Sequence, residues 1–154
     1  MSVSIRWATT VWLVAATSQA ADPRLDVANL ISLAEVQQSV KGADLVGKPA
    51  ASGDTTKYVY SDKQWPAIPI VTIQVKAPKD AAAELSSMVG SAQSIFGLKL
   101  QSVQGVGDEC HYDDQFGTYY FRKGRHVATV GGKGAPGKID VGLIDIARLL
   151  ASRL

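Results

Sequence analysis

The densest set of reactive side chains in this protein lies at residues 108–114, which read DECHYDD. Alternate residues of a regular strand share one face, so Glu109, His111 and Asp113 would point the same way. A neutral imidazole with two carboxylates is a ligand set that suits zinc or a similar ion. The first hypothesis for this segment is therefore a metal site formed by these three residues.

The neighbouring sequence supports a second interpretation of the same face, a polar surface without a metal. Residues 114–117 (DQFG) have the composition of a hairpin loop, and a four-residue loop fixes the pairing of the strands that flank it. The expected cross-strand pairs are Glu109 with Arg122, His111 with Tyr120, and Asp113 with Thr118. Each polar group then has a partner on the next strand, which favours the polar surface over the metal site.

The sequence contains a single cysteine, Cys110, which excludes an internal disulfide. Because adjacent strand residues point to opposite faces, Cys110 and His111 do not form a nucleophile and base pair on a regular strand. A bulge at this position would reverse that conclusion. The face of Cys110 also carries Tyr112, Tyr119 and Phe121, so we expect Cys110 to be a small buried hydrophobic residue.

A second turn at Lys123-Gly124 sets the register of the following strand. A two-residue turn at these positions would place His126 opposite Phe121, whereas a glycine bulge would turn Val127 inward. Lys before Gly is a poor pair for a type I′ turn, so we expect the bulge.

Aromatic residues near position 60 form the best candidate for an exposed recognition surface. Trp65 opens the stiff segment WPAIP at residues 65–69, and Tyr58 and Tyr60 precede it. Rigid aromatic side chains bury a large area at a small entropic cost, which suits the binding of a ligand or a partner. The alternative is that Trp65 covers one end of the core, since tryptophan is usually well buried.

The glycine-rich segment GGKGAPG at residues 131–137 suggests a phosphate-binding loop at first sight. Its spacing does not match the phosphate-loop pattern, and no Ser or Thr follows the lysine to bind magnesium. We therefore expect a flexible connector, and no cofactor is predicted.

Helices are predicted at residues 32–42, at residues 81–96 and after Asp140. Ser32 and Glu35 form a capping-box pattern at the start of the first, and the broad apolar face of the second, with Met88 and Phe96, is expected to be core. Strands are predicted at residues 57–62, at 71–76 and, about three more, from Leu98 to about residue 130, with a loop at 43–56.

The resulting order is α-β-β-α-β-β-β-α. Strands and helices that are segregated in this way predict an α+β domain rather than a doubly wound parallel fold. We expect one antiparallel sheet of about five strands with helices packed on one face.

Residues 1–20 predict export from the cytoplasm. Arg6 is followed by an apolar run from Trp7 to Ala16, and small residues at Ser18 and Ala20 suit signal cleavage. The apolar run is too short for the roughly 20 residues of a membrane-spanning helix. The prediction is a signal peptide removed after Ala20, and a single domain at residues 21–154 located in the periplasm or outside the cell.

The charge balance gives no reason to expect a polyanionic partner. The chain has 154 residues and a net charge of +2, with both signs dispersed. Nucleic acid and anionic membranes are therefore not predicted as partners, and nothing in the chain after the signal predicts a membrane span. We expect a monomer with a small ligand or a cell-envelope protein as its partner.

Three short segments resemble a known group of proteins. Residues 30–36 (LISLAEV) followed by Gly42, residues 105–108 (GVGD), and residues 122–124 (RKG) give the chain a layout similar to small exported bacterial modules such as the extracellular sensor domain of mycobacterial receptor kinases and related lipoproteins. The paired cysteines common in that family are replaced here by Ala28 and Tyr58. The resemblance implies a single-sheet domain with a cleft for a ligand, and it assigns no functional residue.

Three functions remain open from the sequence. The preferred one is a non-catalytic exported binding module with a ligand in a sheet-lined cleft. The second is a protein-interaction role, such as a periplasmic inhibitor or immunity protein that uses Trp65 or an acidic loop. The third is a metal-dependent hydrolase that uses His111, and the presence of only two histidines in the sequence argues against it.

Overall fold

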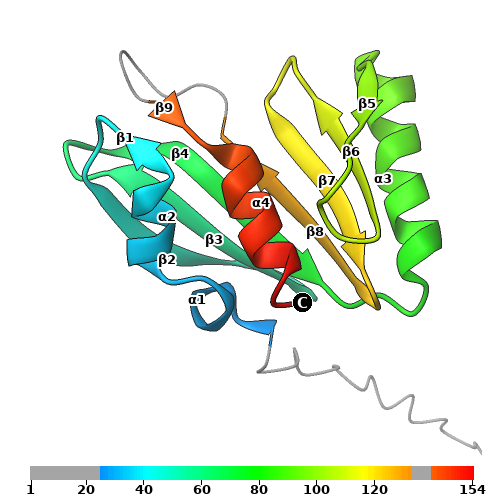
Figure 1. The fold of residues 1–154 in the computed structure, drawn as a ribbon, viewed down its shortest axis with the longest axis horizontal. Helices are drawn as coiled ribbons and strands as arrows, with labels where there is room; N and C mark the ends of the chain where they lie inside the picture. The colour runs from blue at the N-terminus through cyan, green and yellow to red at the C-terminus, as the bar shows by residue number, and fades with distance from the viewer. Residues whose placement is uncertain (1–24, 133–139) are drawn as a thin grey trace, which may run out of the picture.

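The structure is a computed structural model that describes residues 25–132 and 140–154 (Figure 1). The predicted signal peptide at residues 1–20 and positions 133–139 of the glycine-rich connector lie outside the described residues, so both stay predictions. In the part of the chain that is described, no helix combines the length and the apolar character needed to cross a membrane.

The described residues form four helices and nine strands. The first half of the chain contains α1 (Val27–Leu30), α2 (Leu33–Gln38), β1 (Val40–Lys41), β2 (Leu45–Ser52), β3 (Thr55–Asp62) and β4 (Trp65–Lys76). The second half contains α3 (Ala81–Phe96), β5 (Leu100–Ser102), β6 (Glu109–Asp113), β7 (Thr118–Lys123), β8 (His126–Gly131), β9 (Asp140–Val141) and α4 (Leu143–Ala151).

Seven of these strands form one antiparallel sheet in the order β2-β3-β4-β8-β7-β6-β5 (Figure 1). The short strands β1 and β9 pair with each other separately. The α+β class with one main antiparallel sheet is confirmed. The predicted number of strands was too low, chiefly because β2 lies in the segment 43–56 that we expected to be a loop.

The composition of β2 hides the alternation that is typical of a strand. β2 lies at the edge of the sheet, where a proline such as Pro49 is tolerated. Gly47 pairs with Tyr60, and a Cβ atom added at Gly47 would lie 2.5 Å from Cε1 of Tyr58. The two tyrosine rings therefore occupy the space that an apolar side chain of β2 would otherwise fill.

The register of β7 and β8 directs their side chains to two different cores. Phe121 lies opposite Ala128 in the core that α4 covers, whereas Arg122 lies opposite Val127 on the face that α3 covers. α1, α2 and α4 pack on the first face, and α3 packs on the second. The expectation that all helices cover one face was wrong, because β8 carries buried apolar residues on both of its faces.

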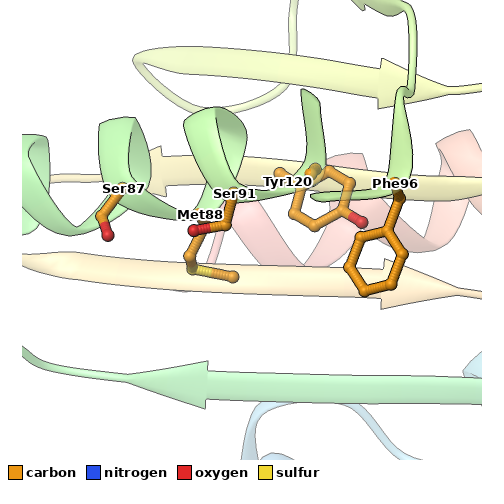
Figure 2. Close-up of a pocket in the computed structure, with 6 residues that line it drawn as sticks. Ser87, Met88, Ser91, Phe96 and Tyr120 are labelled. Carbon is orange, nitrogen blue, oxygen red and sulfur yellow. The ribbon is translucent and has the colours of Figure 1, made fainter. Parts of the chain in front are cut away.

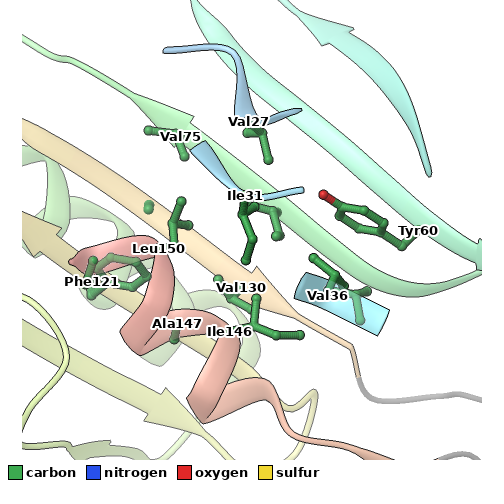
Figure 3. Close-up of a cluster of buried hydrophobic side chains, with 14 of the residues drawn as sticks. Val27, Ile31, Val36, Tyr60, Val75, Phe121, Val130, Ile146, Ala147 and Leu150 are labelled. Atoms are coloured by element: carbon green, nitrogen blue, oxygen red, sulfur yellow. The ribbon is translucent and has the colours of Figure 1, made fainter. Parts of the chain in front are cut away.

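The larger cluster, here called the main core, lies between the sheet and the helices α1, α2 and α4 (Figure 3). α4 contributes Ile146, Ala147 and Leu150, none of which is more than 1% exposed. Burial of an aliphatic side chain of this size contributes about 1.5–3 kcal/mol. The main core also contains Val27, Ile31, Val36, Tyr60, Val75, Phe121 and Val130.

The smaller cluster, here called the second core, joins α3 to the opposite face of the sheet. Its buried members are Ala81 and Leu85 of α3 and Val127 of β8. Val127 is buried as expected, but it contacts α3 and does not lie beside Phe121. The glycine bulge expected at Lys123-Gly124 was wrong, because Lys123 pairs with His126 across a turn formed by Gly124 and Arg125.

An ion pair joins the first helices to the carboxyl end of the chain. The predicted capping box is confirmed, since Ser32 and Glu35 each bond to the other's backbone at the start of α2. Nη1 of Arg153 donates to Oε2 of Glu35 at 2.9 Å and to the carbonyl oxygen of Leu30 at 2.6 Å. The hydrogen bonds from Arg153 and from Ser32 lower the pKa of Glu35 to about 2.

This pKa predicts how Glu35 contributes to stability in acid. The ordinary pKa of the carboxyl is 4.5, so its stabilising contribution is complete above pH 4.5 and is lost as the pH falls toward about 2. Glu35→Gln should therefore lose less stability than the wild type between these pH values. Urea denaturation across this range measures the difference, and Arg153→Met should reduce the acid dependence in the same way. An acid dependence identical to that of the wild type in both variants would contradict the ion pair.

Gly107 supplies a second test of the fold, at the start of β6. Its φ is +62°, and an added Cβ would lie 2.3 Å from the backbone oxygen of Arg122. Gly107→Ala should lower the free energy of unfolding by about 2–3 kcal/mol, since it combines left-handed strain with a backbone clash. Gly105→Ala is the matched control, because Gly105 has a similar φ of +78° with no atom within 4 Å of the added Cβ. It should cost only the strain, about 1 kcal/mol, in the same denaturation assay.

Candidate functional site

The β6–β7 hairpin has the register that the sequence predicted, and His111 and Asp113 have partners within the hairpin. Glu109, His111 and Asp113 lie opposite Arg122, Tyr120 and Thr118. Nε2 of His111 lies 3.1 Å from Oε1 of Glu109. The carboxylate of Asp113 is fully buried and accepts from the backbone amides of Gln115 at 2.9 Å and Phe116 at 3.0 Å.

Asp113, the third residue of the predicted ligand set, is therefore hydrogen-bonded within the hairpin loop. In residues 25–132 and 140–154, no three His, Cys, Asp or Glu side chains form a group that could hold a metal. Glu109, His111 and Asp113 are thus not brought together as a ligand group in the described residues, and the metal hypothesis stays a prediction. Asp113 satisfies backbone groups of the loop, as a short acidic side chain often does in a turn.

The charged residues next to this trio form a structural network. Asp108 accepts from the backbone amide of Gly124 at 2.7 Å and from Nζ of Lys123 at 3.0 Å. These hydrogen bonds lower the pKa of Asp108. Nη1 of Arg122 lies 3.5 Å from the same carboxylate. The network fastens the start of β6 to the β7–β8 turn.

Cys110 is buried in the main core, as expected. Its side chain is 2% exposed, and burial raises the pKa of the thiol to about 12. At neutral pH the group is therefore a protonated thiol without access to solvent, which is the form that does not act as a nucleophile.

The three aromatic residues that were predicted to form one exposed surface differ in how far the fold buries them. Tyr60 is 1% exposed and belongs to the main core, so its assignment to a recognition surface was wrong. Its ring lies 5.1 Å from that of Tyr58, which is half-buried beside it. Trp65 is 57% exposed and does not cover the core. Trp65 therefore stays a candidate for contact with a partner, and so does the exposed part of Tyr58.

A hollow that we did not predict lies between α3 and the sheet (Figure 2). We call it the α3 pocket. Its volume is about 280 Å³, and its lining is mainly apolar. The residues around it are Ser87, Met88, Ser91, Ala92, Phe96 and Tyr120. Figure 2 shows Met88 and Ser91 extending from α3 above β8, with Tyr120 of β7 behind the helix.

The α3 pocket was missed because the whole apolar face of α3 was assigned to the core. Met88 is partly buried in the second core, but Phe96 is 64% exposed and its neighbour Ile95 is 71% exposed. Adjacent helix residues point about 100° apart, so Ile95 and Phe96 cannot both face one narrow core. This excess of apolar residues at the end of α3 was the sequence feature that could have indicated an exposed apolar surface.

Three hydroxyl groups add polar character to the α3 pocket. Ser87 and Ser91 are exposed on α3, and Tyr120 lies on β7. Burial raises the pKa of Tyr120, so the phenol is neutral and donates at neutral pH. An apolar hollow with a few hydroxyl groups suits the binding of a largely apolar ligand, which the hydroxyls would orient.

Comparisons with known proteins found no match to this chain among protein families, curated proteins or solved structures. The resemblance to exported bacterial sensor modules therefore stays a prediction, and the function must be argued from the site alone.

The role of Asp113 can be tested against the metal hypothesis. Asp113→Ala removes the acceptor for two loop amides and should lower the free energy of unfolding by about 1–3 kcal/mol. His111→Ala should change it by less than about 0.5 kcal/mol, because the side chain pairs only at the surface. Urea denaturation with and without EDTA should give the same values for each variant. A wild type that EDTA destabilises, with no such effect in Asp113→Ala, would restore the metal site.

Proposed function

We propose that this protein is an exported, non-catalytic binding module that holds a small, largely apolar ligand in the α3 pocket. The observation that carries the proposal is the pocket itself, an apolar hollow of about 280 Å³ between α3 and the sheet. Export rests on the predicted signal at residues 1–20, and the binding role agrees with the sheet-lined cleft that the sequence led us to expect.

The size and chemistry of the α3 pocket support this role. Ligand sites are hollows of about 300–1,000 Å³ with apolar walls and few polar groups, and this pocket, at about 280 Å³, is slightly smaller than that range. Phe96 leaves most of its ring in solvent, and a bound apolar group would cover it. The hydroxyls of Ser87 and Ser91 would orient the ligand.

The reactive residues of the hairpin support a non-catalytic role. Cys110 is a buried thiol, Asp113 is bonded to two loop amides, and His111 pairs with Glu109. None of these side chains lines the α3 pocket. A ligand in the pocket would therefore contact hydroxyl and apolar groups rather than an acid, a base or a nucleophile from this hairpin.

A second function, as an inhibitor or immunity protein, is favoured by one observation. Trp65 is 57% exposed at the end of the sheet where β3 turns into β4, and Ile68 and Val46 near the same end are 38% and 37% exposed. Exposed tryptophan is a common anchor of protein interfaces. This surface is separate from the α3 pocket, so a test of the pocket does not depend on it.

The proposal is tested by filling the α3 pocket from one side of α3. Ser91→Phe places a ring in the hollow, whereas Ser86→Phe places the same ring on an exposed position of α3 that does not line it. Titration with the apolar fluorescent probe N-phenylnaphthylamine should show binding to the wild type and to Ser86→Phe. The affinity of Ser91→Phe should be about tenfold lower, since a filled site must be displaced or distorted.

Both serine variants should keep the thermal midpoint of the wild type to within a few degrees, because Ser86 and Ser91 are both exposed. Equal probe affinity in all three proteins, or no binding to the wild type, would contradict the proposed site.

A further inference from the structure

The strands beside the α3 pocket present a face that no helix covers in the described part of the chain. α3 packs on β7 and β8, while α1, α2 and α4 lie on the opposite side of the sheet. The α3 side of β2, β3 and β4 is therefore exposed next to the pocket, and we call this surface the open face. Figure 2 shows the flank of α3 that carries Ser87, Met88 and Ser91 directed toward it.

A row of polar side chains crosses from the pocket onto the open face. Tyr120, which lines the pocket, lies opposite Thr129 on β8, and Thr129 lies opposite Gln74 on β4. Gln74 in turn lies opposite Lys57 on β3. Neighbouring strands are about 4.8 Å apart, so the row extends about 14 Å from the pocket to Lys57.

The far end of this row carries positive charge without a paired carboxylate. Lys48 shares the face of Lys57, because it lies opposite Val59, two residues along β3. Such diagonal neighbours are about 7–8 Å apart. No described carboxylate forms an ion pair with either lysine, whereas the nearby Lys76 is paired with Glu84 of α3.

We propose that the ligand is a single-chain lipid with an anionic head group, whose acyl chain occupies the α3 pocket and whose anion binds at Lys57 and Lys48. This inference rests on the proposed function and adds the class and orientation of the ligand. The acyl chain contacts Met88, Ala92 and Phe96, and the polar middle of the molecule lies across Thr129 and Gln74.

The site matches a lipid monomer better than a membrane surface. The apolar lining is a hollow of about 280 Å³ beside a helix, so it suits one chain that has left its bilayer rather than two chains or a flat layer. The positive charges lie about 14 Å from that hollow, which separates the apolar and anionic ends as they are separated in the ligand.

Two ligands that differ only in their phosphate test the inference. Monolauroylglycerol and lauroyl lysophosphatidic acid share the chain and the glycerol, and both are titrated as monomers by displacement of N-phenylnaphthylamine. The wild type should bind the phosphate-bearing lipid about fivefold more tightly, the size of effect expected for a partly exposed ion pair. This preference should weaken as the salt concentration rises.

Substitution of both open-face lysines should remove the preference for the phosphate-bearing lipid and leave the binding of the neutral lipid unchanged. Lys57→Met should reduce the preference, and the double variant Lys48→Met with Lys57→Met should bind both lipids with the affinity of the wild type for monolauroylglycerol. Lys57→Arg should retain the preference. Lys41→Met, which removes an exposed lysine from the separate strand β1, is the matched control and should behave as the wild type. Circular dichroism of each variant confirms that it is folded.

The outcomes separate this inference from the proposed function. Equal affinity for the two lipids in the wild type, or an undiminished preference in the double variant of Lys48 and Lys57, overturns the anionic class while the pocket still binds. Failure of both lipids to displace the bound probe overturns this inference while the pocket still binds an apolar ligand, whereas failure of the probe itself to bind overturns the proposed function and this inference together. Binding to vesicles that contain phosphatidylglycerol, without binding to either monomer, overturns the single-chain ligand in favour of a membrane surface.

Discussion

The arrangement of this protein depends on the alternation of side chains along β7 and β8. Pairing of Phe121 with Ala128 directs one set of residues into the main core, and the neighbouring pair of Arg122 with Val127 directs the other set toward α3. Because the side-chain period of a strand is two, a shift of one residue would exchange the two sets. The positions of α3 and α4 on opposite faces both follow from this single register.

The same register explains why a binding surface exists. A helix is about 10–12 Å wide and strands are about 4.8 Å apart, so one helix covers about two strands. In residues 25–132 and 140–154, the seven-stranded sheet has three helices on one face and only α3 on the other. α3 lies over β7 and β8, so the α3 side of β4, β3 and β2 is left open, and the apolar flank of α3 faces this surface. The pocket and the open face therefore both arise because fewer of the described helices cover one face of the sheet than the other.

The features of the candidate site that were predicted correctly from the sequence depend on interactions within one hairpin. The β6–β7 register was predicted correctly because a four-residue loop fixes it locally, and the buried state of Cys110 followed from it. β2 was missed although it pairs with the adjacent strand, because Gly47 and Pro49 interrupt the alternation of apolar residues that is typical of a strand. The surface role given to Tyr60 and the core role given to Phe96 failed for a related reason: sequence pattern identifies an apolar side chain, but the face that a distant helix leaves uncovered is a tertiary property.

The fold explains one of the two open-face lysines that have no ion-pair partner among the described residues, but not the other. Lys48 lies on β2 beside Pro49, and a lysine or a proline on an edge strand blocks pairing with other chains. Edge protection is therefore a sufficient reason for Lys48. Lys57 lies on β3, which is bonded on one side to β2 and on the other to β4, so it has no edge to protect. The proposed anion would account for the charge of Lys57, which lies in line with Gln74 and Thr129 and has no ion pair with a described carboxylate.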